Sequence, residues 1–230
     1  MKKLKLVCLA VLAAVTLFSC KDETGDFVEQ LYTNSQKSAA IKACLKTSAD
    51  SALNHLCDNN GFYEYLEGEY RINYASLQNS LFDTLNNHGY SYLVDSLILS
   101  TNRLAASCKS QISPSITTAI DSLVIVDYDA LIDGNATAIT DYFKIYQYPS
   151  LKSAFQSPVS IRLNLYGVSP VWNEMVLIYM LYNPTPLNFD LQNYIIEKML
   201  DGILEEMRVE EALIRTDSTH RSDATEMIGK

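Results

Sequence analysis

The chain has 230 residues, of which 48% are hydrophobic and 20% are charged, so its composition is that of a folded globular protein and not of a disordered one. Eight Gly and six Pro are together about half the usual share of roughly 12%, which argues against a turn-rich sandwich or barrel and favours long helices. With 18 basic and 27 acidic residues the net charge is −9, which excludes a general attraction to nucleic acid.

The amino terminus has the organisation of a bacterial secretion signal. Three lysines lie among the first five residues, and an apolar run covers residues 6–18. That run is shorter than the roughly 20 residues of a membrane-spanning helix. It ends in Leu17-Phe18-Ser19-Cys20, which resembles a lipobox and predicts acylation of Cys20. An ordinary secretory signal cleaved nearby is the alternative.

Residues 1–19 are accordingly expected to be removed, with residues 20–39 forming the lipid anchor and a tether. The mature chain would have 15 basic and 27 acidic residues, a net charge of about −12. Several acyl chains on Cys20 would hold it stably on a membrane. The following Lys21-Asp22-Glu23 resembles a short tag that directs lipoproteins to the outer membrane of Gram-negative bacteria, on its periplasmic or surface-exposed face; a solvated tether is the alternative.

Three cysteines remain in the body of the protein. Cys44 and Cys57 lie 13 positions apart in one expected helix, about 20 Å along its axis, so they cannot bridge each other unless that helix breaks. A disulfide from either of them to Cys108 is open, and three buried thiols are the favoured alternative.

Helical periodicity and capping signals recur along the rest of the chain. We expect one irregular all-α bundle of about 8–10 helices without a sheet, over residues 40–216, followed by a polar tail over 217–230. The expected helices cover residues 27–57, 77–85, 90–112, 113–126, a short turn in 127–134, a helix through 140–143, and 150–165, 171–181 and 190–216. Several of these boundaries rest on Pro or Gly, with Pro114 and Pro149 marking helix starts.

The expected helix over 90–112 has two apolar stripes, which is typical of a central helix in a bundle. Asn102 and Arg103 fall within or beside the second stripe. Because a buried Arg needs a partner, this helix is expected to carry a polar pair into the interior.

The helix over 190–216 has four glutamates in its second half, which are Glu205, Glu206, Glu210 and Glu211. We interpret them as a solvated face and not a metal site, and Glu211–Arg215 as an i, i+4 surface pair. The three histidines are far apart, and no phosphate loop, nucleophile elbow or Cys-x-x-Cys is present. No catalytic residue, metal or cofactor is predicted.

Three blocks of the sequence resemble an uncharacterised family of bacterial lipoproteins, domain of unknown function 4197. They are residues 99–106 (LSTNRLAA), residues 129–143 (DALIDG followed by AITDYF), and residues 190–215 from Asp190-Leu191 to Ile214-Arg215. Ser107 stands where that family usually has Glu. The resemblance implies an envelope lipoprotein with a helical fold and no established activity.

Our own hypothesis for a site is a polar cluster in which Asp141 is the carboxylate partner of Arg103. Its six members are Asn102, Arg103, Thr140, Asp141, Tyr142 and Asp201. A buried pair that fixes helix register is favoured over a ligand site.

The sequence therefore predicts a lipid-anchored, non-enzymatic protein that binds or organises an envelope partner. The alternative is a small-molecule or lipid-binding module with a cleft near Arg103, which would require an open apolar pocket there. A hydrolase would need a nucleophile beside a base, and the sequence offers none.

Overall fold

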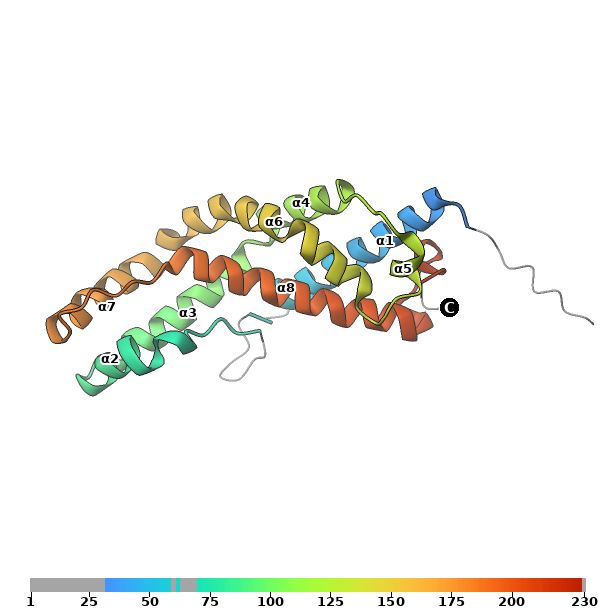
Figure 1. Cartoon of the computed structure of the whole chain (residues 1–230). Helices are drawn as coiled ribbons and strands as arrows, with labels where there is room; N and C mark the ends of the chain where they lie inside the picture. The colour runs from blue at the N-terminus through green and yellow to red at the C-terminus, as the bar shows by residue number, and fades with distance from the viewer. Residues whose placement is uncertain (1–31, 59–60, 63–69, 229–230) are drawn as a thin grey trace, which may run out of the picture. The chain divides into compact units, whose positions relative to one another are not determined.

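A computed structural model describes residues 32–58, 61–62 and 70–228, and within these ranges it contains eight α-helices and no strand (Figure 1). The predicted all-α class is confirmed. The helices are α1 (Asn34–Leu53), α2 (Asp83–Asn87), α3 (Ser91–Ser107), α4 (Lys109–Asp121), α5 (Tyr128–Ile132), α6 (Ala138–Leu165), α7 (Val168–Tyr182) and α8 (Leu191–Thr216). Short turns complete them: π-helical η1 (Asn54–Asp58) and η3 (Gln78–Phe82), and 3-10 turns η2 (Ala75–Leu77), η4 (Ser218–His220) and η5 (Asp223–Thr225).

The predicted signal and Cys20 lie outside the described residues. Among the described helices, none is both long enough and apolar enough to cross a bilayer.

The helical body begins earlier than expected. Thr33 caps α1 in a reciprocal capping box with Gln36, so the helix starts at Asn34 and residues 34–39 are helical instead of part of a tether. The expected long helix over 27–57 is otherwise present as α1 and the π-helical turn η1.

Two prolines predicted to start helices lie inside them. Pro114 is the sixth residue of α4, and Pro149 lies within the 28-residue helix α6. Each removes one backbone hydrogen bond, but a long helix held by its neighbours accepts such a local defect. The expected helix boundary at residue 113 lies instead at Cys108, between α3 and α4.

Helix α8 is the central element; α6 packs along most of its length, and α1 packs against its C-terminal half (Figure 1). Ser51 bonds to Glu210 at 3.0 Å and His55 to Glu206 at 2.8 Å, so α1 and α8 are antiparallel. Helices α2, α3 and α7 build one end of this body, and α5 with η4 lies at the other.

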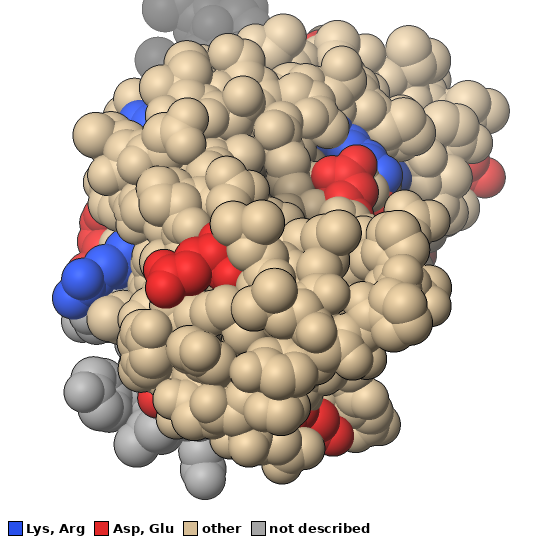
Figure 2. All heavy atoms as spheres, turned by 90° about the vertical axis from the view of Figure 1, so that its left-hand side faces the viewer, with Lys and Arg blue, Asp and Glu red and all other residues tan. Residues whose placement is uncertain are grey.

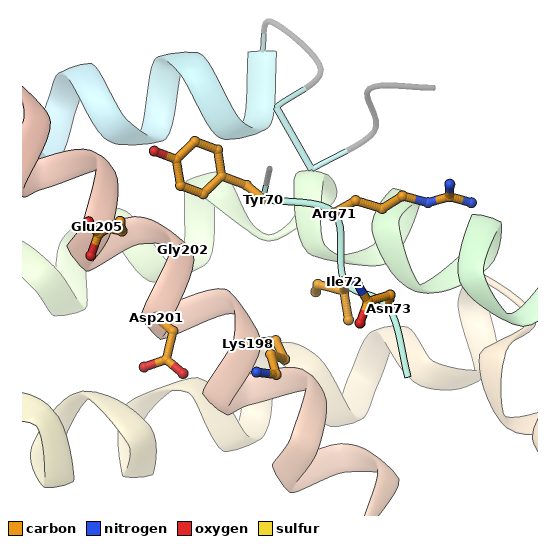
Figure 3. A pocket seen from close by; sticks show the side chains of 8 residues that line it. All are labelled: Tyr70, Arg71, Ile72, Asn73, Lys198, Asp201, Gly202 and Glu205. Atoms are coloured by element: carbon orange, nitrogen blue, oxygen red, sulfur yellow. The ribbon is translucent and has the colours of Figure 1, made fainter. Parts of the chain in front are cut away.

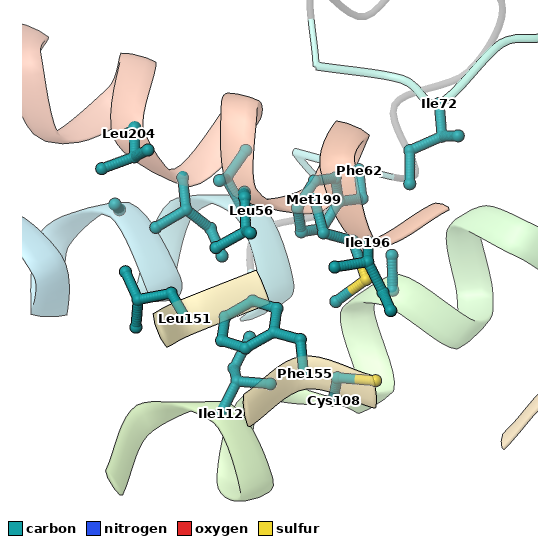
Figure 4. Packing of buried hydrophobic residues seen from close by; sticks show 14 of the residues in the cluster. Leu56, Phe62, Ile72, Cys108, Ile112, Leu151, Phe155, Ile196, Met199 and Leu204 are labelled. Atoms are coloured by element: carbon teal, nitrogen blue, oxygen red, sulfur yellow. The ribbon is translucent and has the colours of Figure 1, made fainter. Parts of the chain in front are cut away.

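The hydrophobic core lies where α1, α4, α6 and α8 meet (Figure 4). Leu151 and Phe155 come from α6, Ile112 from α4, and Ile196 and Met199 from α8, all at most 2% exposed. The amphipathic pattern of α8 explains its place, since one apolar stripe runs from Leu191 to Ile214, over about six turns.

The carboxyl terminus is not a free polar tail, as the sequence had suggested. Turn η5 packs against α1, and Thr225 and Ile228 are buried. Arg221 donates to the carbonyls of Ile214 at 2.7 Å and Arg215 at 2.6 Å, and so satisfies acceptors at the end of α8. The described part of residues 217–230 therefore belongs to the folded body.

Candidate functional site

The six residues of the predicted cluster do not meet in one place. Arg103 was expected to face inward, but it is exposed on α3, whereas its neighbour Asn102 is buried. The two residues are 100° apart on the helix, so only one of them can lie in the middle of the buried face.

Asn102 fixes an extended segment, Tyr70–Tyr74, against α3. Its side-chain oxygen accepts from the Ile72 N–H at 2.8 Å, and its amide nitrogen donates to the Ile72 carbonyl at 3.0 Å. Thr101, one residue earlier, pairs with the Tyr74 hydroxyl at 2.6 Å, and the Tyr194 hydroxyl donates to the Asn73 carbonyl. Asn102 thus replaces the strand partner that this segment lacks.

A polar cavity of about 360 Å³ lies between this segment and α8 (Figure 3). It is lined by Tyr70, Arg71, Ile72, Asn73, Lys198, Asp201, Gly202 and Glu205. A Cβ atom on Gly202 would lie 3.3 Å from the ring of Phe62, so the absence of a side chain at this position allows that ring to pack closely against α8.

The charged groups around this cavity are largely satisfied by the protein itself. Asp201 lies 3.7 Å from Lys144 and 3.4 Å from the Tyr148 hydroxyl, and Glu205 pairs with Arg208. Burial, followed by the negative charge of Asp201, raises the pKa of Tyr148 to about 12. In Figure 3 the Arg71 side chain extends away from α8. Both signs of charge line the cavity, so it has no strong preference for an anion or a cation.

A second cavity, of about 480 Å³, adjoins the end of the same segment at Asn73 and Tyr74. Its lining is more apolar and comprises Asn73, Tyr74, Ala75, Gln78, Asn79, Phe82, Val94 and Ile98. The segment Tyr70–Tyr74, held by the predicted residue Asn102, therefore contributes to both cavities, with Asn73 in the lining of each, and the polar cavity also includes the predicted residue Asp201. This is the best candidate for a site in the described part of the chain.

Asp141 does pair with an arginine, but the partner is Arg208 of α8. Arg208 Nε and Nη2 lie 2.7 and 2.6 Å from the same carboxylate oxygen, and the Thr137 hydroxyl donates to the other at 2.8 Å. Partial burial raises the pKa of Asp141, but the hydrogen bonds from Thr137 and Arg208 outweigh it, so that pKa lies below its usual value.

Thr140 and Tyr142, on either side of Asp141, have partners away from the Asp141–Arg208 pair. The Tyr142 hydroxyl donates to the Val124 carbonyl at 2.9 Å. The backbone N–H of Thr140 donates to Glu211, while its hydroxyl is buried and has no hydrogen-bond partner among the described residues. Thr140, Asp141 and Tyr142 are consecutive in α6, so their side chains leave the helix in different directions.

The ion pair Glu211–Arg215 is buried and joins three helices, although the sequence predicted it on the surface. Glu211 is 0% exposed and Arg215 is 8% exposed. Glu211 accepts from the backbone N–H groups of Ile139 at 3.0 Å and Thr140 at 2.7 Å, at the start of α6. Arg215 bonds to Glu211 and donates to the carbonyls of Leu131 and Ile132 at 2.8 and 2.7 Å, at the end of α5.

Helix arithmetic could have found this pair. Taking 100° per residue from Met207, Glu211 lies at 40° and Ile214 at 340°, so the carboxylate falls within the apolar stripe of α8. Glu211 directly follows Glu210, and such consecutive glutamates are more typical of a solvated face. The second and third sequence blocks of the family resemblance supply both sides of this contact, which gives them a structural role.

The cysteines and histidines offer little reactive chemistry. Cys44, Cys57 and Cys108 are free thiols, and burial raises the pKa of the first two to about 12 and of Cys108 to about 11. Such thiols are weak nucleophiles near neutral pH. His55 pairs with Glu206 and His220 with Glu210. No group of three potential ligands for a metal ion lies among the described residues.

Comparison with known proteins gives one match. No curated protein and no solved structure is significantly similar to the chain. A family model described as a protein of unknown function (DUF4197) matches residues 31–228, which include all of the helices described above. The chain therefore belongs to the DUF4197 family.

Proposed function

We propose that this protein is a lipid-anchored component of the bacterial cell envelope that binds a partner or holds it in place and catalyses no reaction of its own. The amino-terminal pattern supports the anchor: a basic start, a short apolar run, and Leu17-Phe18-Ser19-Cys20 at its end. The outer membrane is the proposed location, on the basis of Lys21-Asp22-Glu23.

The geometry of the ionisable groups supports a non-enzymatic role. Glu211, the most deeply buried carboxylate described, is saturated by two backbone donors and Arg215. Asp141 is held by Arg208 and Thr137. A general base or nucleophile needs a free lone pair directed at a substrate, and these groups direct theirs at the protein.

The anchor is tested with the full chain produced in a bacterium from its own signal. We expect the protein in the membrane fraction, with mass spectrometry showing a mature amino terminus at Cys20 that carries acyl chains. Cys20→Ala should move the protein to the soluble envelope fraction. Cys8→Ala is the matched control, because Cys8 lies within the expected signal, and it should leave the lipidated product unchanged. An unmodified Cys20 inside the mature chain would refute the proposal.

A second function, binding of a small apolar molecule, is favoured by the 480 Å³ cavity beside Tyr74. This volume lies within the usual range for ligand pockets, and Tyr74, Phe82, Val94 and Ile98 give it an apolar wall. The cavity replaces the cleft near Arg103 that the sequence suggested, since Arg103 lines none of the cavities described here.

This alternative is tested by titrating the protein with a fluorescent fatty acid. Ile98→Trp should fill the cavity and abolish binding, whereas Leu99→Trp, on the exposed side of the same helix, should leave it intact. Equal binding by both variants would exclude this cavity as the site.

A further inference from the structure

Two of the three cysteines in the helical body lie where the same helices cross. Cys57 is the fourth residue of the turn η1, which continues α1 and packs against α3. Cys108 is the residue at which α3 ends and α4 begins, and α1 packs against α4. The end of the α1–η1 helix therefore crosses the α3–α4 junction at which Cys108 lies.

An ion pair next to the two cysteines fixes this crossing. Asp58 directly follows Cys57, and Lys109 directly follows Cys108. The Lys109 ammonium group pairs with the Asp58 carboxylate and donates to the side-chain oxygen of Asn54 at 2.7 Å. Both contacts hold the end of η1 against the start of α4, so they keep the two cysteines near each other.

The electrostatics of the thiols agree with this placement. Burial raises the pKa of the Cys57 thiol to about 12, and negative charge on Asp58 and on Cys108 adds to this effect. Cys44 has different neighbours, since burial and then the charge of Glu211 raise the pKa of its thiol. Of the two disulfides to Cys108 that the sequence left open, the fold therefore favours the one from Cys57.

We propose that Cys57 and Cys108 form a disulfide bond when the chain folds in an oxidising compartment. The structure describes the reduced form, in which both are free thiols. The oxidant is a disulfide of another protein or of glutathione. The Cys57 thiolate attacks one of its sulfurs and releases the other as a thiol, and the Cys108 thiolate then displaces the bound sulfur from Cys57. Two protein thiols are oxidised to one disulfide, while the donor disulfide is reduced to two thiols that receive the two protons.

Burial determines when this bond can form. In the completed fold the thiols of Cys57 and Cys108, with pKa values of about 12 and 11, are almost entirely protonated near neutral pH, and disulfide exchange requires a thiolate. In the unfolded chain a cysteine has a pKa of about 8.5. Oxidation therefore precedes the final burial of the two side chains, and burial then protects the finished bond from reductants.

The bond would enclose the segment that contributes to both cavities. Cys57 and Cys108 are 51 positions apart, and the loop between them includes Tyr70–Tyr74, α2 and α3. A disulfide restricts the unfolded chain, and its stabilising effect increases with the length of the loop that it closes. We expect the oxidised protein to have a Tm about 10 °C higher than that of the reduced protein.

The first experiment uses the full chain, produced in a bacterium from its own signal. Free thiols are alkylated in denaturant, and the peptides are mapped by mass spectrometry without reduction. We expect a linked pair of peptides that contains Cys57 and Cys108, and an alkylated Cys44.

The second experiment is independent of export and of the lipid anchor. Residues 20–230 with Cys20→Ser are reduced, unfolded and refolded in a glutathione redox buffer; residues 32–230 form one compact unit, which supports folding of this chain. The same linked pair should form. Alkylated Cys57 and Cys108 after refolding would overturn the proposal, and so would a linked pair that contains Cys44. A bond that forms here but not in the first experiment supports the disulfide and contradicts the proposed envelope location instead.

Matched variants connect the bond with stability. Cys44→Ala removes one buried thiol but leaves the pair, so it should keep the disulfide and the difference in Tm between the oxidised and reduced forms. Cys57→Ala and Cys108→Ala should each abolish both. Leu181→Cys adds an exposed thiol in α7, at the end of the body that Figure 2 views, where charged side chains are few. This thiol should be captured by glutathione as a mixed disulfide, which shows that the buffer is oxidising.

Discussion

Replacement of Glu211 by Gln tests whether the buried pair with Arg215 contributes strongly to the stability of the fold. The substitution preserves the shape of the side chain but removes its charge and turns one acceptor into a donor. The new amide donor would face other donors: either the Thr140 N–H, or the Ile139 N–H together with Arg215. Arg215, only 8% exposed, would be left without a counter-charge.

The expected loss follows from this geometry. Breaking a buried pair by removing one partner costs about 3–5 kcal/mol. For a body of about 200 residues this corresponds to a fall in Tm of roughly 10 °C. Urea unfolding followed by far-UV circular dichroism measures the change in free energy. Glu205→Gln is the matched control, because Glu205 pairs with Arg208 at the surface, and it should lose less than about 1 kcal/mol.

A double variant separates the attraction between the two charges from their hydrogen bonds to the backbone of α5 and α6. Glu211→Leu/Arg215→Met replaces both charges with apolar groups, which for a simple buried pair is about neutral. Here two N–H groups of α6 and two carbonyls of α5 would lose their partners, at about 1–3 kcal/mol for each group left unsatisfied. We expect the double variant to remain at least about 2 kcal/mol less stable than the parent. Full stability in the double variant, or a loss in Glu211→Gln no larger than in Glu205→Gln, would refute the reasoning.

Three further predictions concern other contacts. Asn102→Leu should lose about 2–4 kcal/mol, because both backbone groups of Ile72 lose their partner; hydrogen exchange of the Ile72 amide should accelerate, and an unchanged rate would contradict the role of Asn102. Since the pKa of Asp141 is lowered in the folded state, its stabilising contribution should be present above the unfolded pKa of about 3.9 and be lost as the pH falls through the lower folded value. Asp141→Asn should therefore destabilise the protein more at pH 7 than at pH 3, where the contribution of the ionised carboxylate is already declining, and an equal loss at both would speak against it. Gly134→Ala should lose about 1–3 kcal/mol of stability, because a Cβ would lie 2.6 Å from the Ala130 carbonyl oxygen and from the Ala138 methyl group. Gly89→Ala is the control for backbone conformation, since Gly89 has open space around it but a φ of 85°. A Gly134→Ala protein as stable as the parent in thermal unfolding would show that the α5–α6 turn relaxes freely.

The helices themselves could largely be predicted from the sequence, because their stabilisation is local. The apolar stripe of α8 predicts its bounds to within one residue, and in the structure Asp190 caps its start. Pro114 and Pro149 misled the prediction because a proline is favourable in a first turn but is also accepted in a helix supported by tertiary packing. Local sequence does not distinguish these two cases.

The partners of the polar residues could not be predicted, because they depend on which helices meet. Asp141 was expected to be the partner of Arg103, but in the fold it pairs with Arg208, 67 positions away. Asn102 bonds to a backbone segment that has no helical or strand pattern to indicate its position. These contacts connect distant segments and become visible only in three dimensions.

The antiparallel packing of α1 on α8 has a consequence for the order in which the protein can fold. Ser51 and Glu210, which join these helices, are separated by 159 positions, so the first helix of the body receives its main partner almost last. An emerging chain that lacks α8 leaves the apolar face of α1 uncovered, and long-range contacts of this kind form slowly. If the chain is exported unfolded, as we propose from the Met1–Cys20 pattern, this delay would keep it competent for translocation until its final segment has been delivered.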